Sequence, residues 1–123
     1  MEKKLLIVMG KDEAKRAAQL EIRLSASGYS CVWAHSAEEG LAKAAELNPD
    51  LIILDLVLPK MSGFGFMSAA RDRKELADIP VIVLTALVDQ EVAQASKKLG
   101  ALAYLNTLCK PHDLLKTIAK HMH

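Results

Sequence analysis

Three side chains of complementary chemistry adjoin short apolar runs: the acid Asp55, the hydroxyl Thr85 and the ammonium Lys110. The first directly follows LIIL, the second directly follows VIVL, and the third directly precedes a proline. Each has an ordinary explanation: a strand-end aspartate bonded to nearby N–H groups, a β-branched strand residue and a solvated loop cation. Together at one edge of a sheet, they would hold a phosphoryl group through an acceptor carboxylate, a hydroxyl donor and a counter-charge.

Five apolar runs recur at nearly regular intervals and predict the strands that would position these groups. They are short and rich in Val, Ile and Leu, which is typical of strands buried on both faces of a sheet. The predicted strands cover residues 5–9, 31–34, 51–56, 81–84 and 101–105.

The stretches between these runs have helical spacing, with apolar residues every three or four positions. Ser36 with Glu39 predicts a capping box, Gly28 and Gly100 predict helix ends, and Pro111 predicts the first position of the last helix. The side chains expected to face the sheet are Ala14, Ala17, Leu20 and Leu24, then Val88, Val92, Ala95 and Leu99, then Leu114, Leu115, Ile118 and Met122.

Alternating strands and helices predict a parallel sheet with helices on both faces. In such folds the site lies beyond the carboxyl ends of the strands, near the point where the strand order reverses. The segments expected there are 9–12, 55–57, 85–86 and the residues that end at Lys110.

Composition narrows the class of protein. The 123 residues suit one domain, the formal net charge is +1, and 25% of the residues are charged. The sequence has no apolar run long enough to span a membrane, no secretory leader and no basic stripe for nucleic acid. Its two cysteines, Cys31 and Cys109, are too few and too far apart to suggest a metal site, and we expect a cytoplasmic protein.

The segment LIILDLVLPKMSGFGFM, followed by IPVIVLTA, GALAYL and KP, resembles the receiver domain of two-component response regulators. The resemblance covers essentially the whole chain, so residues 1–123 are expected to form one receiver domain. It implies an α/β, flavodoxin-like (βα)5 doubly wound parallel sheet of strand order 2-1-3-4-5 in three layers.

The resemblance also implies roles for residues. Asp55 would accept a phosphoryl group from a histidine kinase, and the phosphoryl-contacting residues would be Thr85, Ala86 and Lys110. Leu58, Pro59 and Gly63 match the loop after the phosphoacceptor. In the family, Mg²⁺ is bound by the phosphoacceptor, by the backbone carbonyl two residues later, here that of Val57, and by an acidic pair after the first strand.

The acidic pair is missing, because Met9 and Gly10 stand in its place. Asp12 and Glu13 come later, and we expect them to act as acids near the start of the first helix. Mg²⁺ usually needs one or two carboxylates in addition to water. The metal site is therefore expected to be incomplete and Mg²⁺ binding weak or absent, with Lys110 or Lys11 neutralising Asp55.

A second departure lies before Lys110, where the loop is three residues longer than the family pattern. The aromatic switch position matches Tyr104 when counted from Gly100, but Thr107 when counted back from Lys110, and we prefer Tyr104. The resemblance implies a cis peptide bond before Pro111.

The expected function is signalling through protein–protein contacts rather than enzymatic catalysis. Partners would be a sensor histidine kinase or another signalling protein, with a homodimer also allowed and no direct contact to nucleic acid or membrane. The sequence stops after the fifth helix, so output would pass through a partner unless the chain is a fragment. The expected partner surface comprises Gln94, Lys97, Lys98, Tyr104 and Lys116.

The sequence leaves two alternative functions. One is a pseudo-receiver that binds partners without phosphorylation. The other is a flavodoxin-like cofactor-binding protein. A flavin-phosphate site needs a glycine- or hydroxyl-rich loop after the first strand, whereas MGKDEAK has one glycine and no hydroxyl.

Overall fold

The computed structural model describes residues 3–86 and 89–122 of the chain and has one five-stranded parallel sheet. The strands are β1 (Lys4–Val8), β2 (Ser30–Ala34), β3 (Leu51–Leu54), β4 (Val81–Thr85) and β5 (Ala103–Asn106). Their order is β2-β1-β3-β4-β5, which confirms the predicted flavodoxin-like topology. All five predicted strands are present, with ends displaced by at most two residues.

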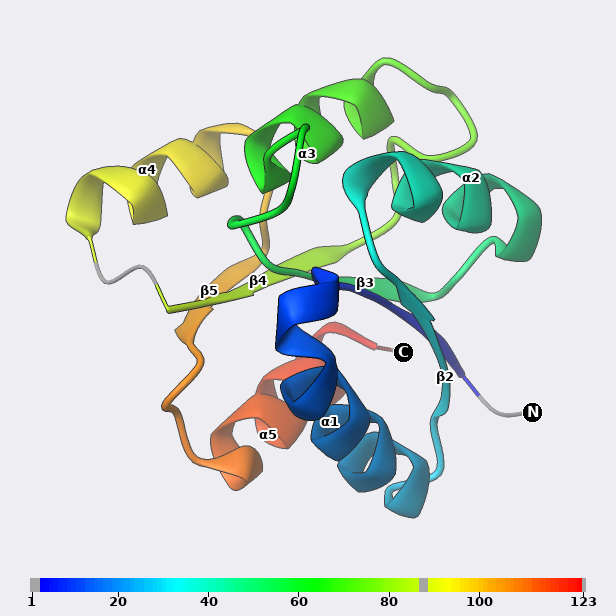
Figure 1. The fold of residues 1–123 in the computed structure, drawn as a ribbon, viewed down its shortest axis with the longest axis vertical. Helices are drawn as coiled ribbons and strands as arrows, with labels where there is room; N and C mark the ends of the chain where they lie inside the picture. Colours follow the sequence, from blue (N-terminus) through cyan, green and yellow to red (C-terminus); the bar gives the residue numbers. More distant parts are fainter. Residues whose placement is uncertain (1–2, 87–88, 123) are drawn as a thin grey trace.

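Helices cover both faces of the sheet, giving three layers (Figure 1). A 3₁₀ turn, η1 (Lys11–Glu13), precedes the first helix. The helices are α1 (Ala14–Ala26), α2 (Ala37–Leu47), α3 (Gly63–Arg71), α4 (Gln90–Lys98) and α5 (Pro111–His121). Helices α2, α3 and α4 lie on one face, and α1 and α5 lie on the other (Figure 1).

The sheet separates two apolar clusters because alternate strand residues point to opposite faces. In β1, Leu6 and Val8 pack toward α2 and α3, whereas Leu5 and Ile7 pack toward α1 and α5. Ala17, Leu20 and Leu24 are buried as predicted, but Ala14 is exposed. Val88, expected to face the sheet, lies outside the described residues.

The predicted helix ends are confirmed by their hydrogen bonds. Ser36 accepts from the N–H of Glu39 at 3.1 Å, while the Glu39 carboxylate accepts from the N–H of His35 rather than that of the cap residue. Gly28 and Gly100 have φ of 94° and 98°, which favours glycine. After each, the next N–H reaches back to the helix, as in Tyr29 N–H to Leu24 O at 3.1 Å.

Candidate functional site

Asp55 follows β3 directly and is only 4% exposed. Its N–H donates to the carbonyl of Val8 at 2.9 Å, which holds the residue against the end of β1. Its Oδ1 accepts from the N–H of Val57 at 3.0 Å, and its side chain is also hydrogen-bonded to that of Thr85. The structure therefore brings the predicted acid and hydroxyl together at the carboxyl edge.

Burial raises the pKa of the Asp55 carboxyl above its usual value, because desolvation penalises the charged form. The hydrogen bonds from Val57 and Thr85 oppose this increase. The negative charge of Glu13 raises the pKa further, and the positive charge of Arg16 lowers it. The carboxylate is thus held in a site that resists its ionisation.

Asp55→Asn is expected to stabilise the protein at neutral pH by about 1–2 kcal/mol, because it removes a buried charge and leaves a side-chain oxygen for Val57. A raised folded-state pKa lowers stability as pH rises through that pKa. The advantage of the variant should therefore shrink as pH falls and disappear below the usual carboxyl pKa of 3.8. Urea unfolding at a series of pH values measures the difference in stability between the variant and wild type. Asp78→Asn is the control, because Asp78 is exposed. Equal stability of wild type and Asp55→Asn at neutral pH would contradict the prediction.

Thr85 ends β4 and is fully buried, whereas Ala86 directly after it is exposed. The carbonyl of Thr85 accepts from the N–H of Thr107 at 3.0 Å, so the chain after β5 continues along this edge. Val57 is 54% exposed. The buried pair Asp55 and Thr85 is thus followed in each segment by an exposed residue, Val57 or Ala86.

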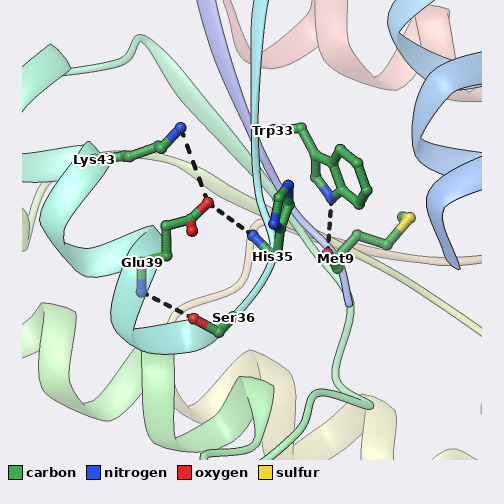
Figure 2. A network of polar contacts seen from close by, with 6 residues as sticks. All are labelled: Met9, Trp33, His35, Ser36, Glu39 and Lys43. Carbon is green, nitrogen blue, oxygen red and sulfur yellow. Dashed lines mark hydrogen bonds and ion pairs between the residues drawn. The ribbon is translucent and has the colours of Figure 1, made fainter. Parts of the chain in front are cut away.

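Met9, the first of the two residues expected in place of the acidic pair, is fully buried and packs in the cluster beneath α1 and α5. Its carbonyl accepts a hydrogen bond from the Trp33 indole at 2.7 Å (Figure 2). The ring of Trp33 lies 4.1 Å from that of His35, centroid to centroid. The His35 N–H donates to Glu39, which also pairs with Lys43 at 3.9 Å (Figure 2). Met9 is therefore part of the core, and its backbone is held by a hydrogen bond from Trp33 of β2.

Gly10 has extended backbone angles and lies beside Asp12, whose Oδ1 would be 2.7 Å from an added Cβ. Asp12 and Glu13 lie in the turn that leads into α1, as predicted. In addition, the charge of Glu13 acts on Asp55, which sequence reasoning missed. Over the described part of the chain, no group of three or more His, Cys, Asp or Glu side chains is placed to hold a metal ion.

The positive charge of Arg16 in α1 lowers the pKa of the Asp55 carboxyl. Its Nε lies 3.4 Å from Oε2 of Glu13, so the two residues form an ion pair at the start of the helix. Lys110 is exposed and is the N-cap residue of α5, and Lys11 is also exposed. The expected neutralisation of Asp55 by Lys110 or Lys11 stays a prediction. For the charge of Arg16, the available signal was the i, i+3 spacing of Glu13 and Arg16 just after the first strand.

The expected cis bond before Pro111 was wrong, because no described peptide bond is cis. Asn106 builds a turn in the longer loop: its Oδ1 accepts from Leu108 N–H at 2.7 Å, and its carbonyl accepts from Cys109 N–H at 2.9 Å. This turn delivers the chain to α5 with Pro111 at the first helical position, where an ordinary trans proline fits. The loop has thus been rebuilt around Lys110.

The two candidates for the switch position lie in different settings. Tyr104 lies within β5 opposite Val83, is half-buried and packs on the α2–α4 side of the sheet. Thr107 lies beyond the strand. In the expected partner surface, Tyr104 is accompanied by four exposed side chains, those of Gln94, Lys97, Lys98 and Lys116.

Comparison with known proteins identifies the family. The family model described as "Response regulator receiver domain" matches residues 6–119. The chain belongs to the response-regulator receiver domain family. Receiver domains of this family bind Mg²⁺ and interact with histidine kinases, and they work in two-component signalling.

Individual relatives of this receiver domain agree with the match. The transcriptional regulatory protein PhoP for alkaline phosphatase synthesis in Bacillus subtilis is 34% identical over 114 residues, covering 93% of this chain and 46% of PhoP. The DNA-binding dual master transcriptional regulator RpaA of Synechocystis is 39% identical over 101 residues, covering 82% of this chain and 41% of RpaA. The receiver domain thus spans less than half the length of these curated relatives.

Among solved structures, the chemotaxis protein CheY4 of Vibrio cholerae superposes on this receiver domain with a TM-score of 0.91 and 31% identity. That match covers 99% of this chain and 100% of the CheY4 chain. Within the described residues of the receiver domain, no helix has the length and apolar character to cross a membrane.

Proposed function

We propose that this chain is an atypical receiver domain that signals through protein–protein contacts, with Asp55 as phosphoacceptor and with magnesium-dependent phosphorylation impaired. The observation that carries the proposal is the pairing of Asp55 with Thr85 at a strand edge beside the buried, apolar Met9. Asp55 and Thr85, the proposed acceptor and hydroxyl of the phosphoryl site, are hydrogen-bonded to each other. Met9, which is expected at the first position of the acidic pair, is a core residue.

Weak or absent Mg²⁺ binding follows from the donor set. Asp55 supplies one carboxylate, and Val57 would supply a backbone carbonyl. Mg²⁺ keeps several water ligands, but it still needs more negative charge than one carboxylate and one carbonyl provide. The carboxylate of Glu13 is paired with Arg16, which reduces its value as a ligand.

The proposed partners are a sensor histidine kinase or another signalling protein in the cytoplasm, and the chain is proposed to act without catalysis. The surface of Gln94, Lys97, Lys98, Tyr104 and Lys116 is the proposed contact region, since four of its members are exposed and three are cationic. A pseudo-receiver that never accepts a phosphoryl group is the second candidate, favoured by the raised pKa of Asp55.

Intact mass after incubation with a small phosphodonor and Mg²⁺ tests the proposal. Wild type should gain a phosphoryl group on only a minor fraction of molecules, and Asp55→Asn should remove that adduct. An adduct that survives Asp55→Asn would show that the acceptor is another residue. Complete phosphorylation of wild type would contradict the impairment, and no adduct at all would favour the pseudo-receiver.

A further inference from the structure

A cavity of about 170 Å³ lies between α1 and the beginning of α5, on the side of the sheet away from α2, α3 and α4. Its apolar lining includes Leu20, Leu84 and Leu114, all of which are buried. The rebuilt loop after β5 contributes Thr107 and Cys109. The cavity therefore has an apolar wall and a border formed by a loop that departs from the family pattern.

Two guanidinium groups, those of Arg16 and Arg23, also line the cavity. They are seven residues apart on α1, or about two helical turns, so they lie on the same helix face. Gln19 lies between them. None of the described residues that line the cavity is acidic, and in the described part of the chain Arg23 makes no ion pair. The electrostatic character of the cavity is therefore cationic.

We propose that this cavity binds a small organic anion, with a carboxylate or phosphate headgroup between Arg16 and Arg23 and an apolar body against Leu20, Leu84 and Leu114. Guanidinium groups bind such headgroups through charge-assisted hydrogen bonds. A cavity of about 150 Å³ lined by apolar side chains accommodates benzene, so the body should be about the size of one aromatic ring. This binding does not require phosphorylation of Asp55.

Arg16 connects the cavity to the phosphoacceptor edge. Its guanidinium pairs with Glu13 and acts on Asp55 while also lining the cavity. A bound anion must therefore compete with Glu13 for Arg16. Glu13→Gln should strengthen anion binding about two- to threefold, because the competing charge is removed. Glu21→Gln removes an acid from the same helix outside the cavity and should change binding less.

Isothermal titration of the unphosphorylated protein with benzoate and with phenyl phosphate tests the proposal. Both anions should bind saturably in the millimolar range. Their two dissociation constants show whether the cavity binds a carboxylate or a phosphate headgroup more tightly. Benzyl alcohol, a neutral molecule of similar size, should bind at least tenfold more weakly, which corresponds to about 1.4 kcal/mol.

Arg23→Gln should weaken benzoate binding about tenfold. Lys15→Gln is the matched control, since Lys15 is an exposed cation of α1 that does not line the cavity. Its effect should stay within twofold. Equal binding of benzoate and benzyl alcohol, equal losses in Arg23→Gln and Lys15→Gln, or no saturation by either anion would overturn the proposal. None of these results depends on whether Asp55 accepts a phosphoryl group, so this proposal and the proposed function fail separately.

Discussion

Replacing Met9 and Gly10 by aspartates is expected to create millimolar Mg²⁺ binding that we do not expect in wild type, and to allow phosphorylation of Asp55 by a small phosphodonor. The two new carboxylates would add hard oxygen ligands beside Asp55. Isothermal titration with Mg²⁺ and intact mass after incubation with the phosphodonor measure the two gains. Adding Asp55→Asn to the double variant should abolish both.

The gain in metal binding should come with a large loss of stability. Met9 is fully buried in the cluster beneath α1 and α5, so an aspartate there places a charge in an apolar setting. We expect a loss of about 3–5 kcal/mol in the free energy of unfolding without metal. Added Mg²⁺ should recover part of it, because a ligand that binds only the folded state stabilises that state. Urea unfolding with and without Mg²⁺ measures both effects.

Gly10→Asp alone keeps the test informative if the double variant does not fold. The extended backbone of Gly10 accepts any residue, and the close neighbour of a new Cβ is the end of the Asp12 side chain, which can rotate away. This single variant should fold and bind Mg²⁺ more weakly than the double variant. If both variants fold and neither binds Mg²⁺, the missing acids do not explain weak Mg²⁺ binding. The rebuilt loop before Lys110 would then be the explanation to test.

Gly63→Ala is expected to destabilise the protein by about 3 kcal/mol or more and to disturb the phosphoacceptor edge. A Cβ on Gly63 would lie 2.6 Å from Cα of Leu56 and 2.7 Å from the carbonyl oxygen of Asp55. Both are backbone atoms, so the start of α3 would have to move away from the segment that follows β3. Overpacking of this kind typically costs 1–3 kcal/mol, and here the hydrogen bond from Gly63 N–H to Leu56 O at 3.0 Å is also at risk.

Gly65→Ala is the matched control, two positions later in the same helix. Its Cβ would meet Cγ of Met61 at 2.7 Å, an atom of a flexible side chain. Alanine is also the better helix former by about 1 kcal/mol. Thermal unfolding should therefore show Gly65→Ala close to wild type and Gly63→Ala many degrees lower. Similar melting temperatures for the two variants would contradict the close approach at Gly63.

The sequence was sufficient to predict the sheet because its strands are buried on both faces and read as continuous apolar runs. Leu51–Leu54 and Val81–Thr85 are examples, in which every residue is buried. Asp55 and Thr85 were predictable as neighbours for the same reason, since the carboxyl ends of parallel strands meet at one edge. The Asp55–Thr85 contact thus follows from topology.

The rest of the site depends on side chains whose direction no local pattern fixes. The effect of the Arg16 charge on Asp55 depends on the rotation of α1 about its axis and on the ion pair between Arg16 and Glu13. The contact of Lys110 with a phosphoryl group was assigned from the Lys-Pro motif and stays a prediction. In the structure, Asn106 builds the turn that precedes Lys110, and Lys110 is the N-cap residue of α5. Pro111 was correctly predicted at the first helical position, and only the cis bond implied by the family resemblance was wrong.

A magnesium titration of the wild-type protein, followed by the backbone amide signals of Met9, Gly10, Asp55 and Val57 in ¹H–¹⁵N NMR spectra, tests the incomplete metal site most directly. Residues at this edge would respond first to an ion bound by Asp55, whose Oδ1 already accepts from Val57 N–H. The account predicts no saturable shift of these signals at millimolar Mg²⁺. Saturable shifts that Asp55→Asn abolishes would contradict it, because they would show that this edge binds the ion without the acidic pair.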